Sequence, residues 1–351
     1  MGYSMFVSGV THLDEKKVFP GYTVCATLSG NAFNLIDLHG EVVHSWAVPP
    51  GTRAYYGFLL PSGNLLAGCA NGTEHSIGGA SAVTVELDWD GNQVMRYEDS
   101  SLHHDRCRLE NGNTIVISHE ELDPAFAARV RGGGPNPAGN EALMLGEQLL
   151  EVTNDGEVVW EWHAHDHLDP EIDAIWGPGR REWLHCNAVE ELPDGRILMS
   201  YNATSRLVLI DKAFGKLLWR LDEGITMTQH NPTWQPDTDR ILVFDNGSSR
   251  RHFSRVIEID PESQSVMWEY VGSPKDSFHS PNISGAQRLP NGNTLVCEGR
   301  PGRLFEITAD GETVWEYVNP REALHGGEPR TRSIFRAYRY AADSAEIRNR
   351  V

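Results

Sequence analysis

Residues 34–46 read Asn34-Leu-Ile-Asp-Leu-His-Gly40-Glu-Val-Val-His-Ser-Trp46, which is an apolar strand, a turn, and a second strand ending in an aromatic residue. The pattern occurs six times in the 351 residues, with the turn at positions 40, 91, 156, 215, 264 and 311. Large rings such as Trp160, Trp162 and Trp315 stand four or six positions after most of these turns. Residues two apart share one face of a strand, so these rings are expected to pack between neighbouring sheets.

A second hairpin precedes most of these units. Its turns read Pro61-Ser-Gly-Asn64, Glu110-Asn-Gly-Asn113, Pro193-Asp-Gly-Arg196, Pro236-Asp-Thr-Asp239 and Pro290-Asn-Gly-Asn293. Gly and Asn supply the positive φ that a tight hairpin needs. Four strands in each unit, repeating at 47–65 residues, are typical of a β-propeller blade. The sequence therefore predicts an all-β, six-bladed β-propeller.

The ends of the chain are expected to close the ring. The first unit lacks its opening strand; residues 22–28 can form its second strand, and the late apolar run 333–340 is free to form its first. Such pairing removes exposed sheet edges. We therefore expect one β-propeller domain over residues 1–351. Long insertions at about 120–146 and 163–183 leave the same blade and are expected to cap one end of the channel.

Composition narrows the classes of function. A net charge of −19 argues against a nucleic-acid partner and against binding to anionic membranes. Residues 1–22 contain no apolar core of signal-peptide length, and no run approaches the ~20 apolar residues of a membrane helix. Five widely spaced cysteines indicate buried free thiols in a reducing compartment. These features favour a cytoplasmic protein.

Polar residues recur at one height of the predicted channel. The innermost strands of a propeller run the same way along its axis, so equal offsets before the hairpin turn lie at equal heights. Six positions before the turn stand Tyr55, His104, Asn187, His230 and Ser284, and two positions earlier His185 and Asn282. The second strands return to this end with Asn71, His119, Asn202, Asn246 and Arg300. The strand geometry in residues 229–247 predicts that His230 lies beside Asn246. A ring that only holds ordered channel water is the simplest alternative; an imidazole-rich channel end otherwise indicates an active site.

Four segments resemble the arylsulfotransferase family: Leu184-His-Cys-Asn-Ala188, Gln229-His-Asn231, Phe244-Asp-Asn-Gly247 and Gly285-Ala-Gln-Arg-Leu-Pro-Asn-Gly-Asn-Thr294. The resemblance extends from about residue 21 to residue 319. It implies a six-bladed propeller that moves a sulfuryl group between phenols through a sulfohistidine. It places His230 at the nucleophile, and His104, His185 and Asn187 at the binding residues.

The chain departs from the family pattern in two respects. Asn202 stands where the resemblance implies a sulfate-binding arginine, unless Arg206 reaches into the site, and the well-known members are exported whereas no signal is seen here. A neutral imidazole can attack sulfur, and side-chain donors can stabilise the sulfuryl oxygens, but loss of an arginine weakens anion binding.

Two other functions therefore remain open. One is a lyase or hydrolase, metal-dependent or not, acting on an aromatic or small polar substrate through His104, His185 and His230 as acids, bases or metal ligands. The other is a propeller that only binds a partner. We expect a small, aromatic substrate and no organic cofactor, with a divalent metal ion left open. The His- and Asp-rich segment 163–183 raises the same question, although its spacing matches no established zinc pattern.

Overall fold

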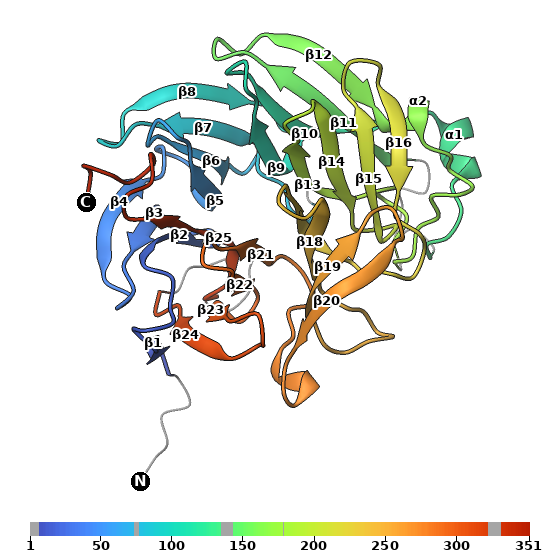
Figure 1. Ribbon diagram of the computed structural model, residues 1–351. Helices are drawn as coiled ribbons and strands as arrows, with labels where there is room; N and C mark the ends of the chain where they lie inside the picture. Colours follow the sequence, from blue (N-terminus) through green and yellow to red (C-terminus); the bar gives the residue numbers. More distant parts are fainter. Residues whose placement is uncertain (1–6, 74–76, 135–142, 178, 322–330) are drawn as a thin grey trace.

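The computed structural model describes residues 7–73, 77–134, 143–177, 179–321 and 331–351. Its strands form six sheets around a central axis, as the repeat predicted (Figure 1). The first three blades, from innermost to outermost strand, comprise β25 (Ile334–Ala341), β2 (Gly21–Thr27), β3 (Ala32–Ile36) and β4 (Val42–Ala47); β5 (Arg53–Leu59), β6 (Leu65–Ala70), β7 (Val83–Leu87) and β8 (Gln93–Glu98); and β9 (Leu102–Arg108), β10 (Thr114–Glu121), β11 (Leu145–Val152) and β12 (Val158–His163).

The other three blades have the same order of strands. They comprise β13 (Cys186–Glu191), β14 (Arg196–Tyr201), β15 (Arg206–Asp211) and β16 (Lys216–Arg220); β17 (His230–Gln235), β18 (Arg240–Asp245), β19 (Arg255–Asp260) and β20 (Ser265–Val271); and β21 (Gly285–Arg288), β22 (Thr294–Glu298), β23 (Arg303–Ile307) and β24 (Thr313–Val318). Three short helical elements complete the described chain: α1 (Pro124–Arg129), α2 (Ala164–His167) and the 3-10 turn η1 (Lys275–Ser277). None of the helices in these ranges is long and apolar enough to cross a membrane.

Both ends of the chain contribute to ring closure. The C-terminal strand β25 pairs antiparallel with β2 and forms the innermost strand of the first blade, as predicted. A further strand, β1 (Gly9–Leu13), which the sequence pattern did not reveal, pairs with β24 on the outer edge of the last blade. The N- and C-terminal segments thus lie on adjacent blades (Figure 1).

The second strand of each blade is buried on both faces because neighbouring blades cover it. In β18, for example, five consecutive residues, Ile241 to Asp245, are buried. Apolar side chains collect into a cluster at each of the six interfaces between blades. Outer strands such as β4 expose most of their residues. Burial on both faces explains why the second strands read as continuous apolar runs.

The aromatic residues after each turn tie one blade to the next. In five blades a tryptophan on the outermost strand donates its indole N–H to a carbonyl in the third-to-fourth-strand turn of the following blade, at 2.8–3.0 Å. The pairs are Trp46 with Asp88, Trp162 with Gly215, Trp219 with Pro261, Trp268 with Ala309, and Trp315 with Leu38. The last pair crosses the closure from the sixth blade to the first. The aromatic residues that recur four or six positions after each turn therefore pack between neighbouring blades, as the sequence predicted.

The two insertions in the third blade contact each other. Gly132 bridges Ile175 and Leu145 bridges Glu182, both in parallel orientation. Part of the predicted cap, residues 135–142 and 178, lies outside the described residues. The paired segments bring Glu182 close to the start of the fourth blade, where it contacts His185.

Candidate active site

The aligned polar residues of the innermost strands lie buried at one end of those strands. Tyr55, His104, Asn187, His230 and Ser284 are each at most 6% exposed. Regular pairing with the second strand is interrupted next to these positions in β5, β9, β13 and β17. Such bulges re-aim side chains that regular alternation would direct elsewhere.

His230 is held in one orientation by Asn246. Nδ1 of His230 lies 2.7 Å from Oδ1 of Asn246. The Asn246 amide nitrogen donates to the carbonyls of Ser280 and Ile283, which fixes which end of the amide faces the ring. Oδ1 can only accept, so Nδ1 of His230 carries the proton and Nε2 keeps its lone pair. This contact is the one that the strand geometry predicted.

The His230 imidazole is neutral near neutral pH. Burial lowers its pKa to about 3, outweighing the hydrogen bond with Asn246, and the charge of Arg336 lowers it further. Among the described residues, no hydrogen-bond donor contacts Nε2 of His230. This nitrogen is therefore an uncharged, unblocked nucleophile or base.

His104 and His185 pack against each other at the same end. Their ring centroids are 4.5 Å apart at an angle of 77°. Gly78 and Gly79 pass over these rings: a Cβ on Gly79 would lie 2.0 Å from Cε1 of His104, so only glycine fits there. Burial holds the pKa of His104 well below its usual range, and the neighbouring histidines, His230 among them, act in the same direction.

His185 forms an ion pair with Glu182. Nδ1 of His185 is 2.8 Å from Oε1 of Glu182. Burial opposes charge on His185, but the adjacent carboxylate outweighs it and raises the pKa of His185. Burial likewise opposes ionisation of Glu182, yet the imidazole lowers the pKa of Glu182 to about 2. The carboxylate of this dyad comes from the second insertion. The sequence did not predict the dyad, because Glu182 and His185 meet only through the way in which that insertion folds.

Asn187 and Asn202 hold the chain that leads into His230. The Asn187 amide donates to the carbonyl of Gln229 at 2.8 Å, and the Asn202 amide donates to the carbonyl of Thr228 at 2.9 Å. Both predicted binding residues thus position the backbone in this structure. Oδ1 of Asn187 is buried without a hydrogen-bond partner in the described part of the chain.

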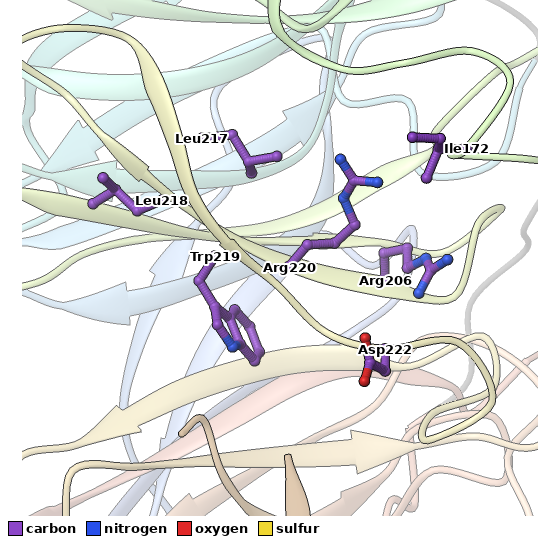
Figure 2. Close-up of a pocket in the computed structure, with 7 residues that line it drawn as sticks. All are labelled: Ile172, Arg206, Leu217, Leu218, Trp219, Arg220 and Asp222. Atoms are coloured by element: carbon purple, nitrogen blue, oxygen red, sulfur yellow. The ribbon is translucent and has the colours of Figure 1, made fainter. Parts of the chain in front are cut away.

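Arg206 does not reach the histidines. Its guanidinium donates to the carbonyl of Leu221 and lies 3.8 Å from Glu223. It lines a surface pocket of about 370 Å³ together with Trp219 and Arg220 (Figure 2). Arg206 therefore does not take the place of the family arginine, a possibility that the sequence had left open.

A different arginine lies on the innermost strand of the first blade. Arg336 of β25 is buried, pairs with Asp105 at 2.7 Å and donates to the backbone carbonyl of Asn187. Its Nε is buried without a hydrogen-bond partner among the described residues. Sequence reasoning treated β25 only as the closing strand, although a charged residue within an apolar innermost strand was a signal.

The remaining predicted residues have other surroundings. Tyr55 packs against Phe335 in an aromatic cluster, with the two ring centroids 4.4 Å apart. Ser284 accepts from the backbone N–H of Gly299 and donates to the carbonyl of Asn282. Asn282 and Arg300 are exposed. The Arg300 backbone N–H donates to the hydroxyl of Ser280, so Arg300 joins two loops of the sixth blade through its backbone.

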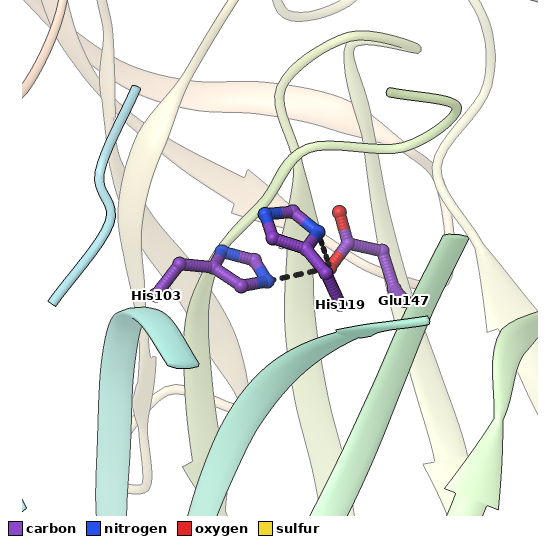
Figure 3. Close-up of side chains that lie close together, drawn as sticks. All are labelled: His103, His119 and Glu147. Atoms are coloured by element: carbon purple, nitrogen blue, oxygen red, sulfur yellow. Dashed lines mark ion pairs between the residues drawn. The ribbon is translucent and has the colours of Figure 1, made fainter. Parts of the chain in front are cut away.

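His119 lies behind His104. It stacks on His103 with ring centroids 3.6 Å apart and nearly parallel planes, and Oε2 of Glu147 lies 2.8 Å from Nε2 of His103 and 3.7 Å from Nδ1 of His119 (Figure 3). Two groups of metal-ligand atoms occur within the described ranges: His103, His119 and Glu147, and Glu120, His163 and His165. The set suggested from sequence, His104, His185 and His230, is not gathered in this way.

An axial cavity of about 520 Å³ lies towards the opposite end of the innermost strands. Its lining includes Pro61 and Glu110 from the hairpin turns, together with Glu190, Arg336 and Tyr338. Burial raises the pKa of Glu190 to about 7. Arg336 thus lies between this cavity and the histidines.

Comparison with known proteins agrees with the fold. Residues 82–320 match the sequence model of a family described as arylsulfotransferase (ASST). No curated protein matches the sequence.

Several solved structures share the architecture. One, a protein of unknown function from Bacteroides caccae, is 14% identical with a TM-score of 0.57 over 91% of this chain and 98% of its own. A streptogramin B lyase is 14% identical with a TM-score of 0.50 over 90% and 83%. A chain of a nidogen/laminin complex is 8% identical with a TM-score of 0.51 over 90% and 97%. At these identities the similarity concerns the fold alone.

Proposed function

The chain belongs to the arylsulfotransferase family, and from this premise we propose that it transfers a sulfuryl group from an aryl sulfate to a phenol, with His230 as the covalent carrier. The observation that carries the proposal is the contact between His230 and Asn246. It leaves Nε2 of a neutral imidazole with its lone pair unused. An imidazole attacks sulfur through its unprotonated nitrogen, so this tautomer of His230 is the one that sulfuryl transfer needs.

The first step forms the carrier. The Nε2 lone pair attacks sulfur in line, the N–S bond forms, and the S–O bond to the aryl group breaks with its electron pair on the phenolate. Nδ1 keeps its proton, and the positive charge that develops on the ring is stabilised by Oδ1 of Asn246 at 2.7 Å. In the second step an acceptor phenolate attacks sulfur and the N–S electron pair returns to Nε2.

His185 and Glu182 serve the proton transfers in this proposal. The raised pKa of His185 makes its imidazolium a suitable acid towards the leaving phenolate, and the resulting neutral ring a base for the acceptor phenol. Glu182 at 2.8 Å from Nδ1 keeps the exchangeable proton on the other nitrogen. His104 packs against His185, and in this proposal its ring N–H donates a hydrogen bond to a sulfuryl oxygen.

Arg336 supports binding of the anion at a distance. Its charge lowers the pKa of His230, so its field reaches the reacting group, although Asp105 compensates part of it. A shared, paired arginine binds an anion more weakly than a free bidentate one. We therefore expect a high KM for the aryl sulfate.

A second candidate uses the same dyad without a covalent carrier. His185 with Glu182 is a general acid–base pair, which a lyase or hydrolase acting on an aromatic or small polar substrate also needs. In that case His230 would be a hydrogen-bond acceptor for the substrate.

One experiment separates the two functions. The protein is mixed with 4-nitrophenyl sulfate without an acceptor, quenched under alkaline conditions, and digested for mass spectrometry. Sulfuryl transfer predicts a stoichiometric burst of nitrophenolate and a sulfated His230 peptide, which added phenol discharges. A protein that forms no adduct and releases no nitrophenolate overturns the proposal.

A further inference from the structure

His103 connects a buried carboxyl of the third blade to His104. Nδ1 of His103 lies 2.8 Å from Nδ1 of His104, and Nε2 of His103 lies 2.8 Å from Oε2 of Glu147 on β11. All three side chains are at most 2% exposed. His104 in turn packs against His185. A continuous series of short contacts therefore leads from Glu147 to the histidines of the candidate site.

His119 lies beside this series and does not belong to it. Its ring is stacked on that of His103 with centroids 3.6 Å apart and an angle of 5° between the planes (Figure 3). Its Nδ1 is 3.7 Å from Oε2 of Glu147, beyond hydrogen-bond distance. Imidazole lone pairs lie in the ring plane, so two parallel rings cannot direct them at one tetrahedral ion. The contact between His103 and Glu147 is therefore one that a proton bridges.

The facing Nδ1 atoms of His103 and His104 share a single proton. Burial lowers the pKa of His103 to about 3 and that of His104 well below its usual range, so each neutral ring carries one N–H. If Nδ1 of His103 donates, Nε2 of His103 has a lone pair and the proton of His104 is on Nε2. If Nδ1 of His104 donates, both assignments reverse. The tautomers of the two rings are therefore coupled.

Glu147 selects between these two arrangements. A protonated carboxyl donates to Nε2 of His103 and selects the first arrangement, whereas a carboxylate accepts from Nε2–H and selects the second. Neither Nε2 of His103 nor Oε2 of Glu147 has another hydrogen-bond partner among the described residues, and a proton between them satisfies both. Burial raises the pKa of Glu147 to about 7, so both states of the carboxyl are accessible near neutral pH.

The groups around Glu147 account for this balance. Burial is the main cause of the raised pKa, and the carboxylate of Glu182 acts in the same direction. The backbone N–H of Cys186, which donates to Oε1, favours the ionised form. The titratable side chains that face Glu147 in the described part of the chain are His103 of β9, His119 of β10, Glu182 and His185 of the segment before β13, Cys186 of β13 and Tyr201 of β14.

We propose that Glu147 is a positioning residue that sets, through His103, whether Nε2 of His104 donates or accepts a hydrogen bond in the site. When the carboxyl ionises, its proton passes to Nε2 of His103, and the Nδ1 proton of His103 passes to Nδ1 of His104. The Nε2 proton of His104 leaves to solvent, so one proton is lost in all. His104 then presents a lone pair where it had presented a donor.

This switch changes how the site meets an anion. The N–H of His104 suits a sulfuryl oxygen, whereas a lone pair on the same nitrogen repels it. The site should therefore bind a sulfate ester better below pH 7 than above it. This consequence rests on the proposed function, whereas the coupling between Glu147 and His104 does not.

The test reads the tautomer of His104 without any substrate. Long-range ¹H–¹⁵N correlation spectra of full-length protein labelled with ¹⁵N-histidine are recorded at pH 6 and pH 8.5, and His104→Gln assigns the signals. We expect the His104 proton on Nε2 at pH 6 and on Nδ1 at pH 8.5. In Glu147→Gln the amide oxygen can keep the bond from the Cys186 N–H, so its NH₂ group donates to His103 at both pH values. His104 should then keep its proton on Nε2 throughout.

Glu120→Gln is the matched control. Glu120 lies on β10 of the same blade, and its two oxygens each lie 2.8 Å from Nδ1 of one histidine, His163 or His165. This variant should show the wild-type tautomers of His104 at both pH values. Kinetics supply a second readout: between pH 6 and pH 8.5, the KM for 4-nitrophenyl sulfate should rise by a factor about ten larger in wild type than in Glu147→Gln, because a hydrogen bond to a charged group is lost.

Each outcome decides a separate point. A His104 tautomer that ignores pH in wild type, or a proton on Nδ1 in Glu147→Gln, overturns the proposal, as does an altered tautomer in Glu120→Gln. If Glu147→Gln does not fold, neutron diffraction from wild-type crystals must show deuterium on Nδ1 of His103 at pH 6 and on Nε2 at pH 8.5, and an unchanged position overturns the proposal. A tautomer change in a protein that does not turn over the aryl sulfate upholds the coupling and overturns the proposed function alone.

Discussion

Nδ1 of His230, the first residue of β17, lies 2.7 Å from Oδ1 of Asn246, the residue that follows β18. One hairpin therefore supplies both the reactive ring and the group that orients it. Further contacts from Asn246 to the carbonyls of Ser280 and Ile283 anchor this pair to the segment that enters the sixth blade. The tautomer of His230 is thus fixed by two neighbouring blades.

Replacement of His230 by Ala is expected to lower kcat for aryl sulfate turnover by a factor of roughly 10³ or more, because the covalent carrier is lost. The loss of the contact to Asn246 should cost about 1–2 kcal/mol of stability. Steady-state kinetics and urea unfolding check both values. The control is His44→Ala: His44 stacks on Trp89 between blades at 4.3 Å, so its removal should lower stability and leave kcat unchanged.

Replacement of Asn246 by Ala frees the His230 ring to rotate and to change tautomer. We expect kcat to fall about 100-fold or more, in the direction seen when a histidine loses its orienting partner. Asn202→Ala is the matched control, because its amide binds the carbonyl of Thr228 and not the ring; we expect an effect below about tenfold. Equal losses in the two variants would contradict the orienting role of Asn246.

The pH dependence of the covalent step follows from the lowered pKa of His230. Burial brings this pKa to about 3, so the nucleophile is protonated only as the pH falls through that value. The burst of nitrophenolate should therefore have the same amplitude at pH 5 and at pH 7. Rapid-quench measurements test this, and a burst that titrates away with a midpoint near 6.5 would show an ordinary, exposed imidazole.

Glu190 in the axial cavity should make stability depend on pH. Burial raises its pKa to about 7, although its carboxylate accepts from the backbone N–H of Trp234. A raised carboxyl pKa contributes stability that is full below its unfolded value of about 4.3 and is lost as the pH rises through 7. The Gln side chain of Glu190→Gln can still accept that bond. As the pH rises from 5 to 8, the free energy of unfolding of wild type should fall by about 1–2 kcal/mol more than that of Glu190→Gln, as measured by urea unfolding.

Deletion of residues 332–351 should prevent cooperative folding. It removes the innermost strand of the first blade, with Arg339 and its buried ion pair to Glu306, and leaves β2 as an exposed edge. Deletion of residues 1–13 is the matched control, because β1 lies on the outer edge of the last blade. Circular dichroism and thermal unfolding should show a folded protein for the second deletion only.

The sequence by itself determined the blades and the closing strand. Each blade is built from hairpins between neighbours in the chain, so turn residues and alternating side chains specify it locally. The turn glycines, such as Gly40 and Gly156, indeed have positive φ, and Trp46 and Trp315 meet the next blade as their spacing predicted. His230 and Asn246 were paired correctly for the same reason, because one hairpin contains both.

The surroundings of the site were decided by the tertiary structure. The dyad of His185 with Glu182 depends on how an insertion folds back, and the position of Arg336 depends on the closing strand. Strand alternation assigns the adjacent residues His103 and His104 to opposite faces, yet their Nδ1 atoms are 2.8 Å apart. His104 has a φ of 49°, which breaks the alternation, and no periodic pattern in a sequence reports such a bulge.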